Sequence, residues 1–253
     1  MHWVIICTAA LFAGGLNAIA GGGSFLTFPA LVLVGVPPIM ANATGTAALL
    51  PGYVTGALAF KDDLGSLRSM TMKKLVVFSL IGGLIGASLL LATSDAGFRR
   101  IIPWLLLAAT CLFAFGGKLA NRYASTAESA GTAGFAPGSV WPLIVVFLVA
   151  IYGGYFNGGL GILLLAAFAL LGETNMNSMN GLKNIASAVL TAISVLVYAL
   201  GDAINWPLAF AMMVCSTLGG YLGGRLARKM PARAVRTVVI ITGAVMTLIF
   251  FQK

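Results

Sequence analysis

Two glycine-rich breaks, one in each half of the chain, are the residues best suited to bind a small ligand. The first comprises Gly21, Gly22, Gly23 and Ser24, and the second comprises Asn157, Gly158 and Gly159. Each break lies between two apolar runs, so a half-helix begins after it. The start of a helix presents unpaired N–H groups and a partial positive charge, and both favour anions. The breaks therefore predict a backbone site for an anion; the alternative is that the glycines only let helices cross.

A second polar group opens the apolar run that follows each break. It comprises Asn42, Thr44 and Thr46 in the first half, and Asn180, Lys183 and Asn184 in the second. Asn42 and Asn180 lie where a side chain would also serve as a helix cap, but Lys183 lies deeper in the run. A lysine inside an apolar span is costly and marks a functional candidate. We expect it to pair with an anionic substrate; the alternative is that it extends to the cytoplasmic surface.

The composition is that of a helical membrane protein. Of 253 residues, 60% are apolar and only 8% are charged, and the mean hydropathy is +1.01. A soluble domain has about a quarter of its residues charged. Apolar runs of about 20 residues, long enough to cross a bilayer, recur along the chain. We therefore expect an all-α polytopic membrane protein.

The same residues exclude most enzyme classes. The chain has one histidine, His2, and its three cysteines lie apart in apolar runs. It offers no nucleophile next to a base, no carboxylate pair and no metal-ligating cluster. We expect no catalytic residue, no metal and no cofactor. The net charge of +9 is explained by basic cytoplasmic loops rather than by nucleic acid.

The two halves of the sequence repeat each other at an interval of roughly 137 residues. Gly35 then falls on Gly172, and Gly82 and Gly86 fall on Gly219 and Gly223. With one residue inserted, Asn42 also falls on Asn180. We therefore expect a first repeat at 1–117, a cytoplasmic linker at 118–139 and a second repeat at 140–253. We expect the paired glycines inside unbroken spans to serve helix packing.

The basic loops indicate that the two repeats face opposite ways. The basic loop is 61–74 in the first half but 225–236, one element later, in the second. Since Lys and Arg mark the cytoplasmic side, each half must cross the membrane an odd number of times. A broken-helix hairpin plus three transmembrane helices meets this condition. We predict two such inverted repeats, with both termini in the periplasm.

Inverted repeats with broken helices are typical of secondary transporters, whose sites lie near the bilayer midplane. We therefore predict a transporter that exports a small anion by alternating access, with the anion held at the glycine-rich breaks. An anion channel of the same fold and a non-transporting scaffold subunit are the alternatives. The expected partners are the small anion and the lipid bilayer, with no nucleic acid, and a homodimer is left open.

Four motifs resemble the signature of the sulfite exporter TauE/SafE family. They are the runs 21–29, 35–38, 41–44 and 180–184. The resemblance covers almost the whole chain. It implies a multi-pass transporter of the bacterial inner membrane that moves small sulfur-containing anions such as sulfite or organosulfonates. It also implies a site at the breaks and polar clusters named above. The second break departs from the pattern: it lacks a third glycine and the serine, and no proline follows where Pro29 follows the first break.

Overall fold

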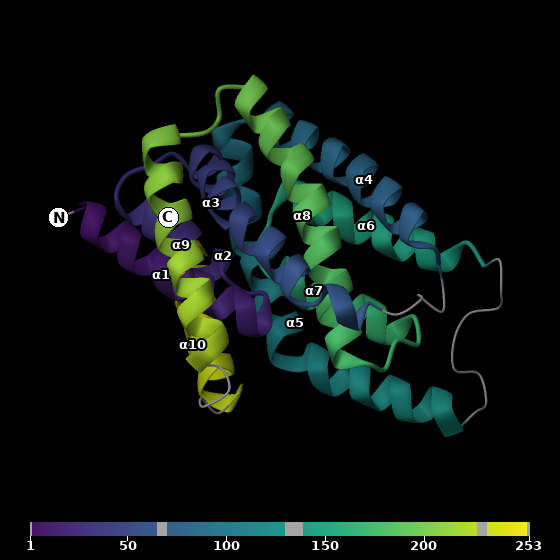
Figure 1. Cartoon of the computed structure of the whole chain (residues 1–253). Coiled ribbons are helices and arrows are strands. Elements are labelled where there is room, and N and C mark those ends of the chain that lie inside the picture. Colours follow the sequence, from purple (N-terminus) through teal and green to yellow (C-terminus); the bar gives the residue numbers. More distant parts are fainter. Residues whose placement is uncertain (1, 65–69, 130–138, 227–231, 252–253) are drawn as a thin grey trace.

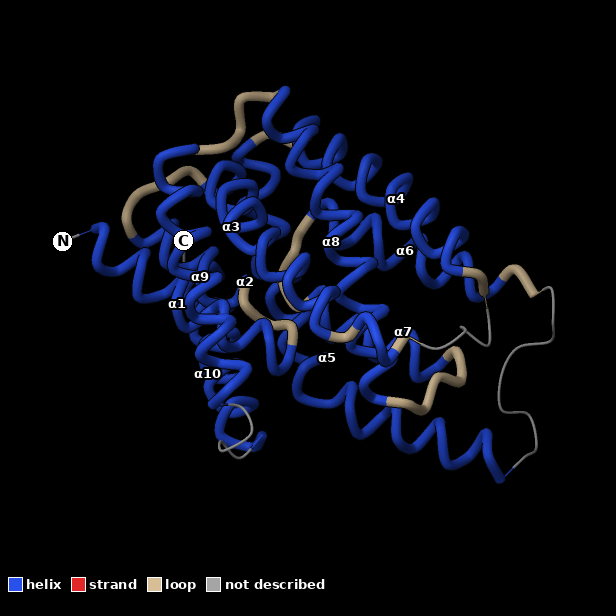
Figure 2. Tube along the Cα trace, viewed as in Figure 1, coloured by secondary structure: helices blue, strands red, loops and turns tan. Residues whose placement is uncertain are grey.

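The computed structural model describes residues 2–64, 70–129, 139–226 and 232–251, and over these ranges the chain is helical without a strand (Figure 1; Figure 2). The helices are α1 (His2–Ala20), α2 (Ser24–Leu33), α3 (Pro38–Ala59), the 3-10 helix η1 (Lys61–Asp63), α4 (Met72–Ala92), α5 (Asp95–Ser129), α6 (Trp141–Tyr155), α7 (Leu160–Leu170), α8 (Met176–Leu200), α9 (Trp206–Leu226) and α10 (Ala232–Phe251). The predicted all-α class is confirmed, and both predicted breaks separate two helices.

Local sequence explains where several helices begin. Pro38 occupies the first position of α3, where its missing N–H costs nothing. Thr71 caps α4 by accepting the N–H of Lys74. Asn175 caps α8, its side-chain oxygen accepting the N–H groups of Asn177 and Ser178 at 3.0 and 3.1 Å. Asn175 is therefore the cap of α8, and Asn180 lies inside the helix and does not cap it.

The two half-helices α2 and α7 end in the same way. Gly35 follows α2 with φ +91°, and Gly172 follows α7 with φ +86°. The N–H of Val36 then bonds to the carbonyl of Leu31, and that of Glu173 to the carbonyl of Phe168, both at 3.0 Å. This is the Schellman arrangement, for which a left-handed glycine is favoured. The two half-helices thus end in matching hydrogen bonds at positions 137 residues apart.

The half-helices are short. At 1.5 Å per residue, the 10 residues of α2 and the 11 of α7 rise about 15 and 16 Å. That length is about half of a hydrocarbon layer of about 30 Å. Each half-helix is therefore too short to cross such a layer by itself.

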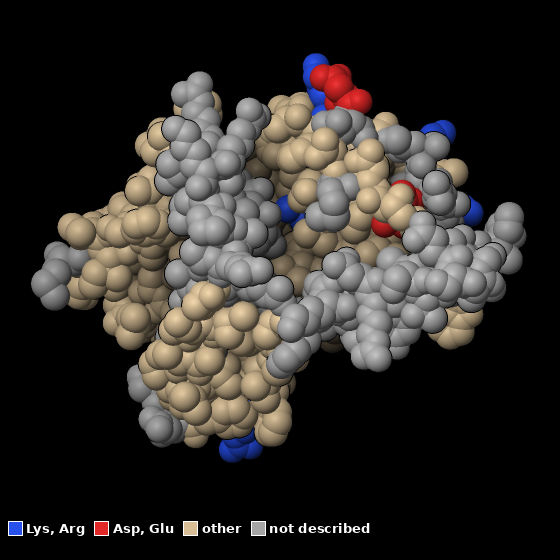
Figure 3. Space-filling model, turned by 90° about the horizontal axis from the view of Figure 1, so that it is seen from below, with Lys and Arg blue, Asp and Glu red and all other residues tan. Residues whose placement is uncertain are grey.

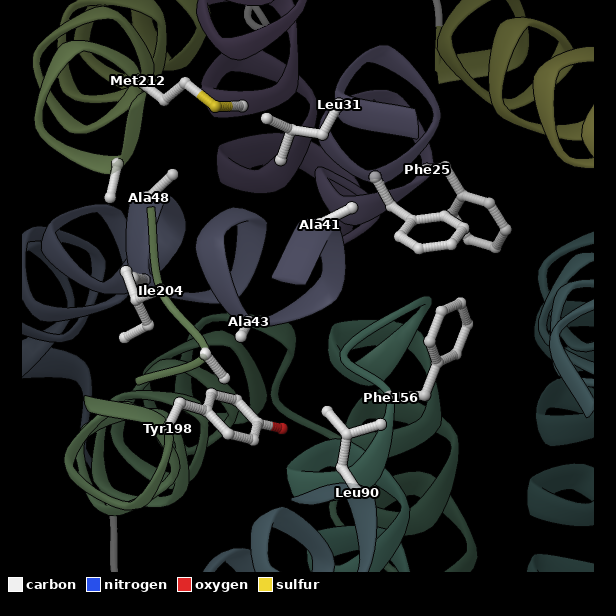
Figure 4. Close-up of a cluster of buried hydrophobic side chains, with 14 of the residues drawn as sticks. Phe25, Leu31, Ala41, Ala43, Ala48, Leu90, Phe156, Tyr198, Ile204 and Met212 are labelled. Atoms are coloured by element: carbon white, nitrogen blue, oxygen red, sulfur yellow. The ribbon is translucent and has the colours of Figure 1, made fainter. Parts of the chain in front are cut away.

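The helices pair in an exchange pattern. Helix α1 packs on α9 and α6 packs on α4, while α3 packs on α8 and α5 on α10. Each helix of the first half has a counterpart five helices later, so that α1 corresponds to α6 and α4 to α9. Exchanging counterparts turns the α1–α9 pair into the α6–α4 pair and leaves the α3–α8 and α5–α10 pairs unchanged. The core lies where the halves meet: Figure 4 shows side chains from both, including Phe25, Leu31, Ala41, Ala43, Ala48, Leu90, Phe156, Tyr198, Ile204 and Met212.

Glycines let the outer helix pairs approach closely, as predicted. A methyl group on Gly86 would overlap the carbonyl oxygen of Ile151 on α6, and one on Gly82 would meet Ala150 at 2.5 Å. On the other side, a methyl on Gly219 would overlap the carbonyl of Leu11 on α1. These glycines serve packing, the role of small residues in membrane helix pairs.

We expect Gly219→Ala to destabilise the protein by about 1–3 kcal/mol, because it forces α1 and α9 apart. The neighbouring variant Gly220→Ala is the control, since its added methyl would lie 3.7 Å from the nearest atom, the carbonyl oxygen of Gly14. Thermal unfolding of both detergent-purified variants measures the difference. Equal melting temperatures for the two variants would contradict this packing.

The outside of the molecule is apolar. On α4 the exposed large apolar side chains are Val77, Leu80, Ile81, Leu84, Ile85 and Leu89. In Figure 3 only a few acidic or basic side chains interrupt the described surface. Within the described ranges, Met72–Ala92 and Asn177–Leu200 are long and apolar enough to cross a membrane. Helices also occur at the other four predicted spans, and the number of crossings stays a prediction.

The linker differs from expectation in its first part. The sequence predicts a flexible connector at 118–139, but α5 continues as a helix to Ser129. Alanine-rich sequence with few glycines favours helix propagation, which explains the extension. Residues 130–138 lie outside the described part of the chain, as do side chains of the basic segment 225–236.

Candidate functional site

The two hairpins meet at their tips. A methyl group on Gly21 would lie 2.7 Å from the Cα of Gly161, and one on Gly161 would lie 2.6 Å from the Cα of Gly21. The two backbones thus touch without intervening side chains. Beside this contact, the rings of Phe28 and Phe156 pack edge to face at 5.7 Å. The structure therefore brings the two predicted breaks together in space. The two glycines in contact, Gly21 and Gly161, are 140 residues apart in the sequence.

The tips have different backbone geometry. Gly21 is left-handed in the first tip (φ +77°), whereas Gly159 is left-handed in the second (φ +74°) and stands directly before α7. Gly23, the residue before α2, has ordinary helical angles. The second break lacks the third glycine of the first, and its backbone makes a different turn. The residues of both tips, including Gly22, are buried.

Three side-chain hydrogen bonds, two of them from the first half, converge on the second tip. Ser24 Oγ donates to the carbonyl of Asn157 at 2.9 Å, and Asn42 Nδ2 donates to the carbonyl of Tyr155 at 3.1 Å. The hydroxyl of Tyr152 donates to the carbonyl of Gly158 at 2.7 Å. The carbonyl groups freed by the break are therefore largely satisfied within the protein. What remains available at this tip is a donor.

That donor is the side-chain amide of Asn157. The hydroxyl of Tyr53 donates to Asn157 Oδ1 at 3.1 Å, whereas Asn157 Nδ2 has no hydrogen-bond partner among the described residues. Tyr53 and Asn157 are each 1% exposed. Tyr53 thus fixes the acceptor oxygen, and the two N–H donors of the amide have no described partner. Asn17, near Tyr53 at the end of α1, is also buried, and its Oδ1 is unpartnered.

We expect Tyr53→Phe to weaken anion binding and lower stability together. The change leaves Asn157 Oδ1 without its donor, which costs about 1–3 kcal/mol for a buried group, and it frees the amide to turn. Thermal unfolding with and without anion measures both effects. Tyr221→Phe, at a side chain that is 59% exposed, is the control. If Tyr53→Phe and Asn157→Ala add without coupling, the two side chains do not act together.

Lys183 is the most unusual side chain of the candidate site. It lies in the third turn of α8, is 1% exposed, and its Nζ has no hydrogen-bond partner within the described ranges. Of the charged side chains whose burial is described, only Lys183 and Glu173 are buried, and Glu173 lies in the loop before α8. The alternative that Lys183 extends to the surface is wrong. An ammonium group in the interior without a partner is costly and requires compensation.

The other predicted residues lie around the helix pair α3 and α8. Thr44 Oγ1 accepts the N–H of Asn205 at 3.0 Å, and Thr46 is 2% exposed. Asn184 lies against Gly56, its Nδ2 2.7 Å from the place of an added methyl. Asn180 is half-buried in the first turns of α8. Thr44 is therefore a packing residue between α3 and the loop before α9, and Asn184 faces α3.

Sequence reasoning missed Tyr53 and Asn17. Tyr53 lies three turns along α3 from Asn42, on the same helical face as Asn42 and Thr46, so its position was readable from helical periodicity. Asn17 closes α1 just before the first break. Neither residue belongs to a motif, and only the meeting of the two hairpins brings Tyr53 to Asn157.

The site is built for binding rather than for bond making. Among the described residues no group of three His, Cys, Asp or Glu side chains gathers to hold a metal. The buried side-chain groups without a described partner include donors at Lys183 and Asn157 and an amide oxygen at Asn17. Such donors suit an anion that has several acceptor oxygens.

An apolar exterior, crossed half-helix hairpins and a buried, unpaired lysine define a helical membrane protein with an internal polar site. The family model for the sulfite exporter TauE/SafE matches residues 6–250, and the chain belongs to this family. A probable membrane transporter protein of Haemophilus influenzae is 30% identical over 252 residues, covering 96% of this chain and 92% of the relative. The probable membrane transporter protein YfcA of Escherichia coli is 26% identical, covering 96% and 87%.

A third relative, the probable membrane transporter protein ORF9 of Sinorhizobium, is 27% identical, covering 92% of this chain and 86% of its own length. No solved structure matches the chain significantly. The family and these relatives place the protein among membrane transporters rather than enzymes. The resemblance inferred from the four sequence motifs is thereby confirmed.

Proposed function

We propose that the protein is a secondary transporter that exports small sulfur-containing anions, such as sulfite or an organosulfonate, across the bacterial inner membrane. The anion binds between the two hairpin tips and α8. Lys183 supplies the positive charge and Asn157 supplies neutral N–H donors. The two repeats move against each other around the tips to expose this site alternately to each side.

The observation that carries the proposal is the unpartnered ammonium group of Lys183. It is 1% exposed, and its nitrogen has no hydrogen-bond partner within the described part of the chain. Breaking a buried ion pair by removing one partner costs about 3–5 kcal/mol. A protein that retains a lone buried ammonium group therefore needs a negative partner that arrives from outside. A substrate anion meets that need.

The division into two inverted repeats is part of the proposal. The exchange pattern of helix pairs and the matching ends of α2 and α7 support it. The first repeat comprises residues 1–117 and the second 140–253. The segment between them lies in the cytoplasm and both termini lie in the periplasm, in accord with the positions of the basic loops.

Export of an anion needs no proton-carrying carboxylate. With the cell interior negative, moving one negative charge outward gains about 2.3 kcal/mol per 100 mV. The two acidic residues nearest α8 in the sequence, Glu173 and Asp202, lie in the loops before and after it. Driving export by the membrane potential accords with their positions outside the helix.

The first experiment is thermal unfolding of the detergent-purified protein with sulfite, sulfate, thiosulfate, sulfoacetate, taurine, acetate and chloride. A ligand at 100 times its dissociation constant that binds only the folded state adds about 2.7 kcal/mol. We expect a rise with a sulfur oxyanion or sulfonate and none with chloride. Uptake and counterflow in liposomes follow: counterflow identifies a carrier, and flux without counterflow identifies a channel. A monodisperse protein that neither binds nor transports any of these anions would contradict the proposal.

A further inference from the structure

From Asn180 onward, helix α8 carries its polar residues on the face that is turned into the protein. At 3.6 residues per turn they fall within an arc of about 100°. They are Asn180, Lys183, Asn184, Ser187, Thr191, Ser194 and Tyr198. All are buried except Asn180, which is half-buried, whereas Leu196 and Leu200 on another face are 54% and 82% exposed. A helix with its polar face inside and its apolar face outside suits a polar path through a membrane.

The polar groups on this face are hydrogen-bonded toward the end of α8 and unpartnered nearer its start. Toward the end of α8, Ser194 Oγ donates to the carbonyl of Leu190 at 2.7 Å, and the hydroxyl of Tyr198 donates to the carbonyl of Gly154 on α6. Nearer the start of α8, Lys183 Nζ, Ser187 Oγ and Thr191 Oγ1 have no partner within the described ranges. Their residues are 1%, 0% and 0% exposed. The unsatisfied groups thus occupy three successive turns.

Three unsatisfied groups in succession require an explanation, because roughly 90% or more of buried polar groups in proteins are hydrogen-bonded. Serine and threonine in helices usually donate to the carbonyl four residues earlier. Ser194 does so, whereas Ser187 and Thr191 do not. Ser187 lies about 6 Å and Thr191 about 12 Å beyond Lys183 along the helix axis. A small anion bound at Lys183 therefore does not also reach Thr191.

We propose that Ser187 and Thr191 form a second anion position, deeper in the protein than Lys183, on a track along α8. This proposal rests on the proposed function and extends it. The anion is captured at Lys183 and passes to the hydroxyl groups, which are neutral donors. Binding that is strong at one position and weaker at the next lets a bound ion leave. Because this face of α8 carries a lysine and no carboxylate, the track excludes cations.

The hydrogen bonds of Ser194 and Tyr198 close the far end of the track. They join α8 to Gly83 of α4, at 3.3 Å from Ser194, and to Gly154 of α6. The anion therefore enters from the end at which α8 begins, which is the lower end in Figure 1 and faces the reader in Figure 3. Both basic and acidic side chains are visible on that face, with one basic group near its centre.

The test measures labelling of single cysteines in a protein whose Cys7, Cys111 and Cys215 are replaced by alanine. The probe is 2-sulfonatoethyl methanethiosulfonate, which is water-soluble and anionic. We expect Ser187→Cys and Thr191→Cys to react on the order of tenfold faster than the controls, since cysteine reactivity follows access to solvent as well as thiolate character. The controls are Ser79→Cys and Thr110→Cys, at hydroxyls that are also buried and unpartnered but lie on α4 and α5.

The outcomes separate this proposal from the proposed function. If Ser187→Cys and Thr191→Cys react no faster than the controls, the track is wrong, whether or not Lys183→Cys reacts. If both react and sulfoacetate slows them, both proposals stand. If both react and none of the sulfur anions slows them or is transported, the track stands and the substrate class is wrong. Sulfoacetate is used for protection because sulfite itself cleaves the disulfide label.

A second measurement avoids the cysteine background. Ser187→Ala and Thr191→Val remove the hydroxyl groups with little change in shape. We expect each to lower the rate of sulfoacetate counterflow about tenfold, the effect of one lost hydrogen bond to a charged group. Ser79→Ala and Thr110→Val should leave counterflow unchanged. Equal losses in all four variants would overturn the assignment to α8.

Discussion

Lys183→Met is expected to raise the thermal stability of the anion-free protein and to abolish anion binding. Lysine and methionine have similar length, so the methionine fills the same space without a charge. Taking an ammonium group out of water costs several kilocalories per mole when no partner compensates it. A gain of about 2 kcal/mol would raise the melting temperature by about 4–8 °C in a chain of this size. The same change removes the only charged donor of the site, so anions should no longer raise the melting temperature.

Two further lysine variants make this result specific. Lys74→Met changes an exposed lysine at the start of α4 and should alter neither stability nor binding beyond about 0.5 kcal/mol. Lys183→Arg keeps the charge and should retain some anion binding at the expense of packing. If Lys183→Met lowers the stability of the anion-free protein, the lysine is paired within the fold and does not await a substrate. The proposed function would then lose its main support.

Much of the architecture was readable from local chemistry. The Gly21–Ser24 and Asn157–Gly159 breaks fall between helices because consecutive glycines disfavour helix and allow left-handed backbone. The interval that pairs Gly35 with Gly172 also pairs the hydrogen bonds at the ends of α2 and α7. Lys183 was identified because a charge within an apolar run is rare. These features depend on residues that are neighbours in sequence.

The rest depends on which segments meet in three dimensions. The sequence predicts that a half-helix begins after the second break, but it does not predict that Gly161 in this half-helix touches Gly21. Asn42 was considered a cap, but it bonds to the carbonyl of Tyr155 in the other hairpin. Both contacts cross between the repeats, and no periodicity within one repeat encodes them. Sequence motifs therefore predict where the hairpin tips lie, but they do not predict which side chains of the other half bond to the tips.

The asymmetry of the site also exceeds what the repeat predicts. Tyr53 of α3 has Thr191 of α8 as its counterpart in the register that pairs Asn42 with Asn180. Tyr53 is bonded within the protein, whereas the hydroxyl of Thr191 is unpartnered in the described structure. The first half thus supports the hairpin tip through the hydrogen bond of Tyr53, whereas the second half has an unpartnered hydroxyl at Thr191. A strictly symmetric reading of the sequence would have given both the same role.

Gly21→Ala is expected to be the most damaging alanine substitution among the glycines of the hairpin tips, because two costs act at one residue. Gly21 has φ +77°, which costs an L-residue about 1–2 kcal/mol. Its added methyl would also lie 2.7 Å from the Cα of Gly161, an overlap with backbone that costs about 1–3 kcal/mol. Together we expect a loss of about 2–5 kcal/mol.

Three other glycines separate the two costs. Gly161→Ala tests the overlap alone, since its methyl would lie 2.6 Å from the Cα of Gly21. Gly35→Ala tests strain alone, since φ is +91° and no atom lies within 4 Å of the added methyl. Gly52→Ala, with neither cost, should be neutral or slightly stabilising in helix α3. Thermal unfolding of the four variants should rank Gly21 as the most affected and Gly52 as the least.

Anion binding by the same variants decides whether the crossing of the hairpins is part of the site. Both Gly21→Ala and Gly161→Ala push the tips apart and so displace Asn157, which is tied to the first tip through Ser24. We expect both variants to lose the anion-dependent rise in melting temperature, and Gly35→Ala to keep it despite its lower stability. If Gly161→Ala folds and binds the anion like the unmodified protein, the contact between the tips serves packing alone, and the anion site lies with α8.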